Sequence, residues 1–191
     1  KLIDRNPALL PLGEPEISRL IKQELEKRIE LHLGVEILEI QRGDNGYTVM
    51  AKDARTGRRK RISASHVMVN AGRRSNADLL KPENAGIETD NAGFIKVDKY
   101  LRTNIKHIWA LGDAIGRKMF THAGDKEAEL AWHNARHKQQ IGMDFESVPY
   151  AVYTHPQIAS VGLTERQARH DHEILVGRAL YSDTVMGEAM M

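Results

Sequence analysis

Two carboxylates that follow short apolar runs are the first residues of this chain that could bind a cofactor. Asp113 follows Gly112 at the end of the run 108–111, and Asp4 follows an apolar pair near the start. A carboxylate at the end of a buried strand can accept hydrogen bonds from a sugar or polyol hydroxyl, and a neighbouring glycine lets a ligand approach the backbone. Apolar runs ending in Gly-Asp are common, so this pattern alone has little specificity.

Asp4 has two interpretations that the sequence leaves open. At the tip of the second strand of a dinucleotide-binding fold, it would accept hydrogen bonds from an adenosine ribose and favour NAD over NADP, whose 2′-phosphate it repels. On pattern alone, a turn residue in Asp-Arg-Asn-Pro is the more common case. Arg5 weakens the preference for NAD, since it could meet a phosphate. We expect the Gly-rich fingerprint of such a fold about 20 residues upstream of the carboxylate, before Lys1.

The elements that follow Asp4 alternate between helix and strand. Apolar residues recur at helical spacing over 16–33 and predict a helix there, ended by Gly34. Short apolar segments separated by glycine turns predict strands over 35–40, 47–51, 60–64 and 66–71. This order is typical of half of a doubly wound nucleotide-binding domain and places the chain in the α/β class.

The second half of the chain predicts a looser arrangement. Strands are expected over 94–97, 108–111, 150–161 and 174–181, and a helix over 124–141. Thr164 and Gln167 form the pattern of a capping box that opens a short helix over 165–169. The stretch 145–149 is the best domain boundary.

Composition and charge argue against several classes of protein. The chain has 191 residues and a formal net charge of +2, too small to indicate a nucleic-acid partner. The basic run 58–61 follows a Thr56-Gly57 turn and is far more typical of a solvated hairpin end. The absence of cysteine excludes a redox disulfide within these residues. No apolar stretch approaches the roughly 20 residues of a membrane span and no signal-peptide pattern is visible, so we expect a cytoplasmic location.

Metal binding and hydrolytic catalysis find little support. His133 and His137 share one face of the predicted helix, a spacing that could bind a metal. However, Asn134 stands where a zinc protease carries its glutamate, and a solvated helix face is much more common. No Gly-x-Ser-x-Gly nucleophile motif occurs. We therefore expect no metal site.

The segment 103–113, Thr-Asn-Ile-Lys-His-Ile-Trp-Ala-Leu-Gly-Asp, resembles the second flavin-binding signature of the class I pyridine-nucleotide disulfide oxidoreductases. That family includes dihydrolipoamide dehydrogenase, glutathione reductase, mercuric reductase and mycothione reductase. The resemblance implies that Asp113 accepts a hydrogen bond from the ribityl chain of FAD. This eleven-residue pattern is much more specific than Gly-Asp alone.

Two further resemblances concern residues that bind NAD in the family. The segment 71–76 is similar to the family's Gly-Arg-x-Pro-Asn, where the chain leaves the NAD domain beside the nicotinamide, which implies a role for Gly72. Ser75 replaces the family's proline, so the turn is expected to be less rigid. Val35 matches a strand position that lines the adenine side.

Met119, Phe120, Thr121 and His122 resemble the family's Met-Leu-Ala-His, which precedes a helix. In the family the backbone N–H groups here face the pyrimidine edge of the flavin, where a positive helix end stabilises negative charge. Phe120 and Thr121 depart from the usual Leu and Ala, a change that backbone contacts tolerate. Without the resemblance, His122 would more often be a helix-start residue than a cofactor ligand.

The segment 148–165 looks very like the opening of the family's C-terminal dimerisation domain. His155-Pro156 is similar to the catalytic His-Pro of the family, but the fifth residue after it is Ser160 and not the orienting glutamate. His155 therefore matches the interface motif. We expect the catalytic dyad beyond Met191, the redox cysteines before Lys1, and no catalytic residue in this chain.

These resemblances imply a Rossmann-like α/β flavoprotein segment: the second half of an NAD-binding domain (1–76), the returning segment of an FAD-binding domain (77–146), and the start of an α+β dimerisation domain (147–191). The implied activity is that of a dihydrolipoamide dehydrogenase with FAD and NAD, homodimeric at full length, acting on a small dithiol or a lipoyl domain. The segment alone would be inactive. The alternatives are an NAD(P)H-dependent reductase of the mycothione or mercuric type, and a non-catalytic nucleotide-binding or dimerising module.

Overall fold

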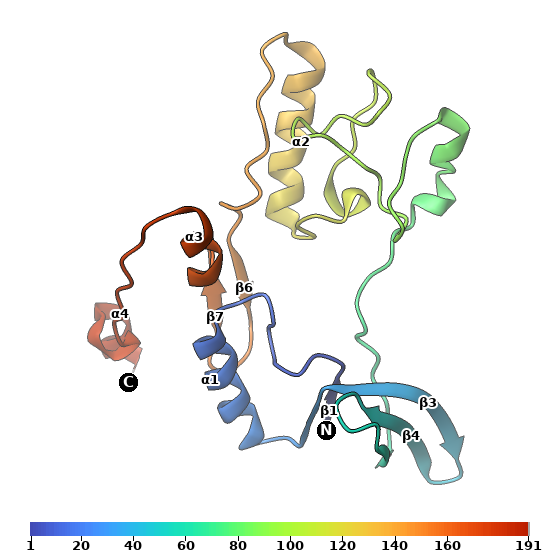
Figure 1. Cartoon of the computed structure of the whole chain (residues 1–191), viewed down its shortest axis with the longest axis vertical. Helices are drawn as coiled ribbons and strands as arrows, with labels where there is room; N and C mark the ends of the chain where they lie inside the picture. The colour runs from blue at the N-terminus through green and yellow to red at the C-terminus, as the bar shows by residue number, and fades with distance from the viewer. Residues whose placement is uncertain (191) are drawn as a thin grey trace.

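The structure is a computed structural model that describes residues 1–190. It contains strands β1 (Leu2–Asp4), β2 (Leu31–Leu33), β3 (Val35–Gly43), β4 (Gly46–Asp53), β5 (Arg59–Ala64), β6 (Tyr150–Val152) and β7 (Ile158–Ser160). The helices are α1 (Pro15–Glu26), α2 (Thr121–Arg136), α3 (Glu165–Asp171) and α4 (Val185–Met190), with 3-10 turns η1 (Ala77–Leu79), η2 (Pro82–Ala85), η3 (Gly112–Ile115) and η4 (Tyr181–Asp183). Figure 1 shows the sheet of β3 and β4 at one end and α2 at the other.

The first elements form a β-α-β unit. β1 and β2 pair in parallel, with Leu2 opposite Leu31 and Asp4 opposite Leu33, and α1 makes the connection. The predicted helix over 16–33 is thus correct at its start and wrong at its end, because α1 stops at Glu26. The last part of the predicted helix is instead β2, where pairing with β1 satisfies the backbone groups. Helical spacing of apolar residues cannot reveal that distant partner.

The strands predicted over 35–40, 47–51 and 60–64 are confirmed. β3, β4 and β5 form an antiparallel sheet in sequence order, with Gly43 opposite Gly46 at the first turn. Gly57, at the second turn, has a left-handed φ of 71°. The sheet buries a cluster of small and β-branched side chains: Val35, Val49, Ala51 and Ile62, with Ile3 and Val67 packed against it. This cluster lies wholly within the predicted segment 1–76.

The second part is built around α2. Its core consists of Leu101, Ile115, Leu130 and Ala131, with Val97, Trp109, Ala110, Met143 and Phe145 packed against them. The strands predicted over 94–97 and 108–111 are reduced to single bridges, Thr89 to Ile95 and Arg102 to Trp109. The predicted helix is confirmed, although it begins at Thr121 and ends at Arg136.

Two other predicted strands are wrong. Residues 66–71 have no regular structure, and Met68 and Val69 are 84% and 69% exposed. Residues 174–180 are likewise irregular, and Leu175 is fully exposed. A strand needs a neighbour for its backbone groups, and within residues 1–190 no strand pairs with either segment. Apolar composition alone therefore overestimated the strand content.

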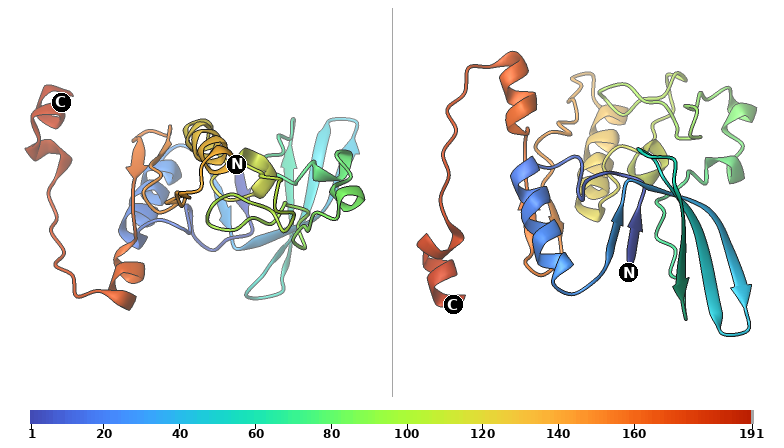
Figure 2. Two further views of the ribbon diagram at one scale, coloured as in Figure 1. Left: turned by 90° about the horizontal axis from the view of Figure 1, so that it is seen from above. Right: turned by 60° about the horizontal axis from the view of Figure 1, so that its bottom comes forward.

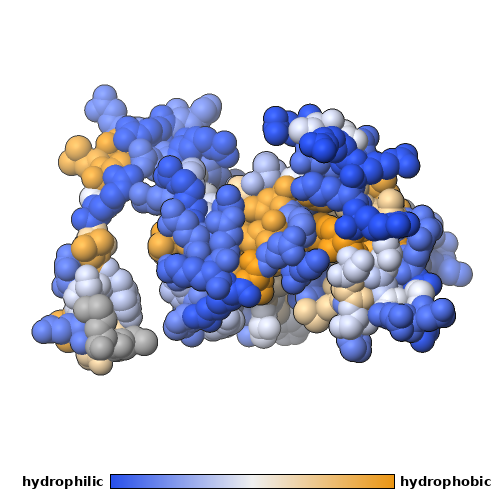
Figure 3. Space-filling view, turned by 90° about the horizontal axis from the view of Figure 1, so that it is seen from below, coloured by the Kyte–Doolittle hydropathy of each residue, from blue (hydrophilic) through white to orange (hydrophobic). Residues whose placement is uncertain are grey.

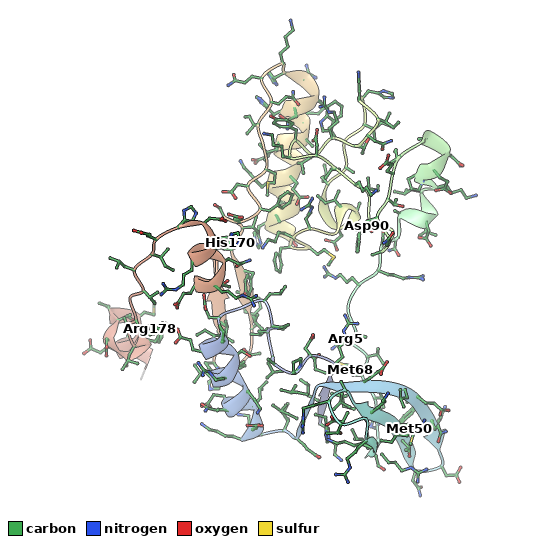
Figure 4. All side chains as sticks on the ribbon, viewed as in Figure 1. Arg5, Met50, Met68, Asp90, His170 and Arg178 are labelled. Atoms are coloured by element: carbon green, nitrogen blue, oxygen red, sulfur yellow. The ribbon has the colours of Figure 1, made fainter. Side chains whose placement is uncertain are left out.

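The C-terminal part begins with the hairpin of β6 and β7, which replaces the continuous strand expected over 150–161. The capping box is confirmed. The Thr164 side chain accepts a hydrogen bond from the backbone N–H of Gln167, and the Gln167 side chain accepts one from the backbone N–H of Thr164, so α3 begins at Glu165. The residues after α3, from 172 to 190, extend away from the other elements as an arm (Figure 2). Arg178, labelled in Figure 4, ties this arm to α1 and α3 through Glu16 at 3.0 Å and Glu165 at 3.6 Å.

The surface is uneven in polarity. On the face drawn in Figure 3, apolar atoms gather in the middle and polar atoms flank them. Among the described residues, none of the helices is long and apolar enough to cross a membrane. The described part of the chain also holds no group of three or more side chains suited to a metal ion.

Candidate flavin and nucleotide site

Asp113 is the second residue of η3, which begins directly after the extended residue Leu111. Gly112 has a φ of 67°, a left-handed conformation that favours glycine, and a Cβ built on it meets nothing within 4 Å. The Asp113 side chain is 63% exposed. The turn therefore presents a carboxylate beside open backbone, an arrangement that can accept a hydroxyl hydrogen bond from a ligand lying over Gly112.

The N-terminus of α2 is the second component of the site. Its N-cap residue, Phe120, is extended, and no side chain in the described residues caps the helix. The first turn also contains no acidic residue. The N–H groups of that turn and the positive end of the helix dipole are thus available to an electron-rich group.

Arg73 joins these two components. Its Nη1 donates to Asp113 Oδ2 at 3.2 Å and to the carbonyl oxygen of Met119 at 3.0 Å. The predicted FAD residues at 113 and 119–122 are therefore neighbours in space. Gly72, a predicted NAD residue, precedes Arg73 with a φ of 102° and open space where a Cβ would stand.

The side chains of Phe120 and His122 turn toward the hairpin of the C-terminal part. The Phe120 ring stacks on His122, with centroids 5.6 Å apart, and on Tyr150, with centroids 6.3 Å apart. His122 Nε2 lies 2.8 Å from the carbonyl oxygen of Pro149 and donates to it. The two side chains pack at this junction, so only their backbone groups belong to the helix end.

Glu127 is a residue of this region that the sequence patterns did not single out. It is 0% exposed, and its Oε2 accepts the Gly112 N–H at 2.5 Å. Burial raises its pKa, and the nearby charge of Asp113 adds to the rise, while the Gly112 hydrogen bond opposes it. A signal was present: Glu127 lies on the buried stripe of α2 with Ala123, Leu130, Ala131 and Asn134.

Unlike Gly72, the other two residues predicted to bind NAD, Asp4 and Val35, belong to the region of the β3–β4–β5 sheet. Asp4 Oδ1 accepts the backbone and side-chain N–H groups of Asn6 at 2.8 and 3.0 Å, as in the turn interpretation. Val35 is 1% exposed and packs in the core of the sheet, so its side chain offers no surface to a ligand. These two positions share one region, because Ile3 packs against the cluster that holds Val35.

The residues at the helix end fit a flavin cofactor. An exposed carboxylate suits the polyol of a ribityl chain, the open backbone at Gly112 allows close approach, and an uncapped helix N-terminus suits an anionic edge. The arrangement is that of a cofactor-binding protein with a βαβ nucleotide fold.

Comparisons with known proteins identify the family to which the chain belongs. Residues 1–137 match the family model described as pyridine nucleotide-disulphide oxidoreductase. Residues 148–190 match the dimerisation domain of the same family. The chain belongs to this family, which uses FAD and NAD, so the resemblance found in the sequence is confirmed.

The similar proteins are dihydrolipoyl dehydrogenases and a flavoprotein disulfide reductase. A dihydrolipoyl dehydrogenase of Thermus scotoductus is 33% identical and one of Vibrio cholerae 32% identical, over 95% and 94% of this chain. In solved structures, the HOCl-induced flavoprotein disulfide reductase RclA from Escherichia coli superposes with a TM-score of 0.75 and 26% identity, over 88% of this chain and 38% of RclA. The chain spans 39% of the length of either dehydrogenase.

Proposed function

We propose that this chain is a segment of an FAD-dependent dihydrolipoamide dehydrogenase, which oxidises a dithiol through a redox disulfide and FAD and reduces NAD. The segment is not catalytic by itself, since it contains no cysteine. The observation that carries the proposal is the contact of Arg73 with both Asp113 and Met119, which gathers the predicted flavin residues into one place.

The residues of the segment would bind and orient the cofactor. FAD, when bound, supplies electron transfer between the dithiol–disulfide pair and the nicotinamide. Asp113 would accept a hydrogen bond from a ribityl hydroxyl and so set the position of the ring system along the chain. The N–H groups of Met119, Thr121 and His122, just before and at the start of α2, would stabilise negative charge at the pyrimidine edge, whereas the Phe120 N–H donates to the carbonyl oxygen of Lys118.

The domain assignment supports the same function. We propose that 1–76 contributes to the NAD domain, 77–146 to the FAD domain and 147–191 to a domain that forms a homodimer at full length. The two buried clusters, one in each of the first two segments, agree with this division. Asp4 would meet the adenosine ribose, which requires that Asn6 release it. Val35 would act through its backbone alone, since its side chain is in the core. The cytoplasmic location stays a prediction.

The first experiment is to sequence the coding DNA on either side of this segment and to express the complete reading frame. The expected result is a Gly-x-Gly-x-x-Gly and a Cys-x4-Cys upstream and a His-Pro-x-x-x-Glu downstream. The purified protein should be yellow and should reduce NAD with dihydrolipoamide. A reading frame without the cysteine pair would contradict the proposal and leave a nucleotide-binding or dimerising module.

A second candidate is a reductase that consumes NAD(P)H, of the mycothione or mercuric type. The likeness to a flavoprotein disulfide reductase favours it, and Arg5 could meet a 2′-phosphate. The same preparation separates the two functions. A preference for NADPH and a disulfide or Hg(II) acceptor, with no dihydrolipoamide oxidation, would establish the reductase.

A further inference from the structure

We propose that Glu127 is a positioning residue of the flavin site: it holds the Gly112–Asp113 turn against α2, so that Asp113 and the start of α2 meet the cofactor in a set relation. The proposal rests on the proposed function for the role of Asp113. It concerns a residue that does not touch the cofactor and that acts through the backbone of Gly112.

The burial of Glu127 is the first observation. The side chain is 0% exposed on the inner face of α2, between Ala123 and Leu130. A buried carboxyl group costs stability unless hydrogen bonds satisfy it. An apolar side chain would fill this position without that cost, so packing alone does not account for a glutamate here.

The hydrogen bonding of Glu127 is the second observation. Its Oε2 accepts the Gly112 N–H, a hydrogen bond between a buried carboxyl group and a backbone amide. Its Oε1 is buried and has no partner among the residues that the structure describes. One carboxyl oxygen of Glu127 therefore binds the turn that carries Asp113, and the other oxygen makes no hydrogen bond among the described residues.

The close packing of the turn explains why this bond matters. A Cβ built on Gly124, in the first turn of α2, lies 3.8 Å from the Cα of Gly112. The bond from Glu127 fixes the next turn of the same helix to Gly112 as well. The close approach at Gly124 and the hydrogen bond from Glu127 together restrict the distance and the orientation of Asp113 relative to the helix end.

The contact is tested first in the complete protein freed of FAD, by a nitrogen-15 NMR spectrum with labelled glycine. In wild type, the Gly112 amide proton should resonate far downfield and exchange slowly. Glu127→Gln keeps an acceptor oxygen and should retain most of this shift, whereas Glu127→Leu should abolish it. Glu129→Gln is the matched control, since Glu129 is exposed on the same helix and pairs with Lys126. A Gly112 amide that is unchanged in Glu127→Leu overturns the proposal.

The consequence is tested in the complete enzyme, by the dissociation constant for FAD. Glu127→Leu should bind FAD at least about tenfold more weakly, and Glu127→Gln within about threefold of wild type, because leucine has no acceptor for the Gly112 N–H whereas the glutamine carbonyl oxygen keeps that hydrogen bond. Equal binding by wild type and a folded Glu127→Leu protein, as judged by circular dichroism, overturns the flavin role. If wild type binds no FAD but the Gly112 amide signal still changes in Glu127→Leu, the proposed function is wrong. The role of Glu127 in holding the Gly112–Asp113 turn is then still supported.

Discussion

Arg73 Nη1 lies 3.2 Å from Asp113 Oδ2, and the same nitrogen donates to the carbonyl oxygen of Met119 at 3.0 Å. One guanidinium therefore connects the segment that follows the β3–β4–β5 sheet to both components of the candidate flavin site. The pair is open to solvent, since the Arg73 and Asp113 side chains are 58% and 63% exposed. Exposure limits the strength of this ion pair and makes it sensitive to salt.

Arg73→Ala in the complete enzyme should weaken FAD binding by a few fold, because an exposed ion pair contributes at most about 1 kcal/mol. The loss should be visible at low ionic strength and should shrink at about 0.5 M salt, where screening has already weakened the pair in wild type. FAD fluorescence titrations at the two salt concentrations measure both effects. Arg74→Ala, at the adjacent position, is the control. A loss that is the same at both concentrations would argue against an electrostatic role.

Asn134→Ala should destabilise the chain by about 3 kcal/mol, because buried backbone groups lose their partners. Asn134 is 3% exposed, donates to the carbonyl oxygens of Tyr100 and Ile141 at 3.0 and 2.8 Å, and accepts the Ile141 N–H at 2.8 Å. Urea unfolding measures the change. Glu129→Ala, on the exposed side of α2, should stay within about 0.5 kcal/mol of wild type. Equal free energies of unfolding for the two variants would show that the hydrogen bonds of Asn134 do not stabilise the chain.

Gly116→Ala should cost about 3 kcal/mol, for two reasons that add. Gly116 has a φ of 65°, and a Cβ there would lie 2.5 Å from Cγ of Phe94. Gly57→Ala isolates the first reason, because Gly57 has a φ of 71° and nothing within 4 Å, so about 1 kcal/mol is expected. Thermal unfolding of both variants gives the comparison. A Gly116→Ala protein no less stable than Gly57→Ala would mean that the Phe94 ring moves freely.

Asp53 should contribute to acid unfolding. Hydrogen bonds, first from the Thr56 backbone and side chain, hold the pKa of Asp53 below its usual value of 3.8. A lowered folded-state pKa means that the stabilisation is present above the unfolded pKa and is lost as pH falls through the folded one. Asp53→Asn cannot titrate, so the stability advantage of wild type over it should be constant near pH 6, should begin to shrink near pH 4, and should be lost only as pH falls through the folded-state pKa, which lies below 3.8. Melting temperatures between these values check the sign, and an advantage that grows toward low pH would contradict it.

Several elements were predictable because short-range interactions determine them. The glycine turns of the β3–β4–β5 sheet, the capping box at Thr164 and the helix α2 all follow from residues within a few positions of one another. The resemblance of residues 103–113 to a flavin-binding signature of the family was also recognisable, since these residues are contiguous in the sequence. The sequence by itself therefore determined the family and the class of cofactor.

Only the tertiary structure decided features that depend on distant partners. β2 exists because β1 lies beside it, whereas residues 66–71, equally apolar, have no such neighbour in the described chain. Arg73 meets Asp113 across the two parts of the molecule, and Glu127 becomes a buried anchor because α2 packs on the turn at Gly112. Hydrogen bonds and burial of this kind are set by the approach of segments far apart in the chain, which local residue patterns do not contain.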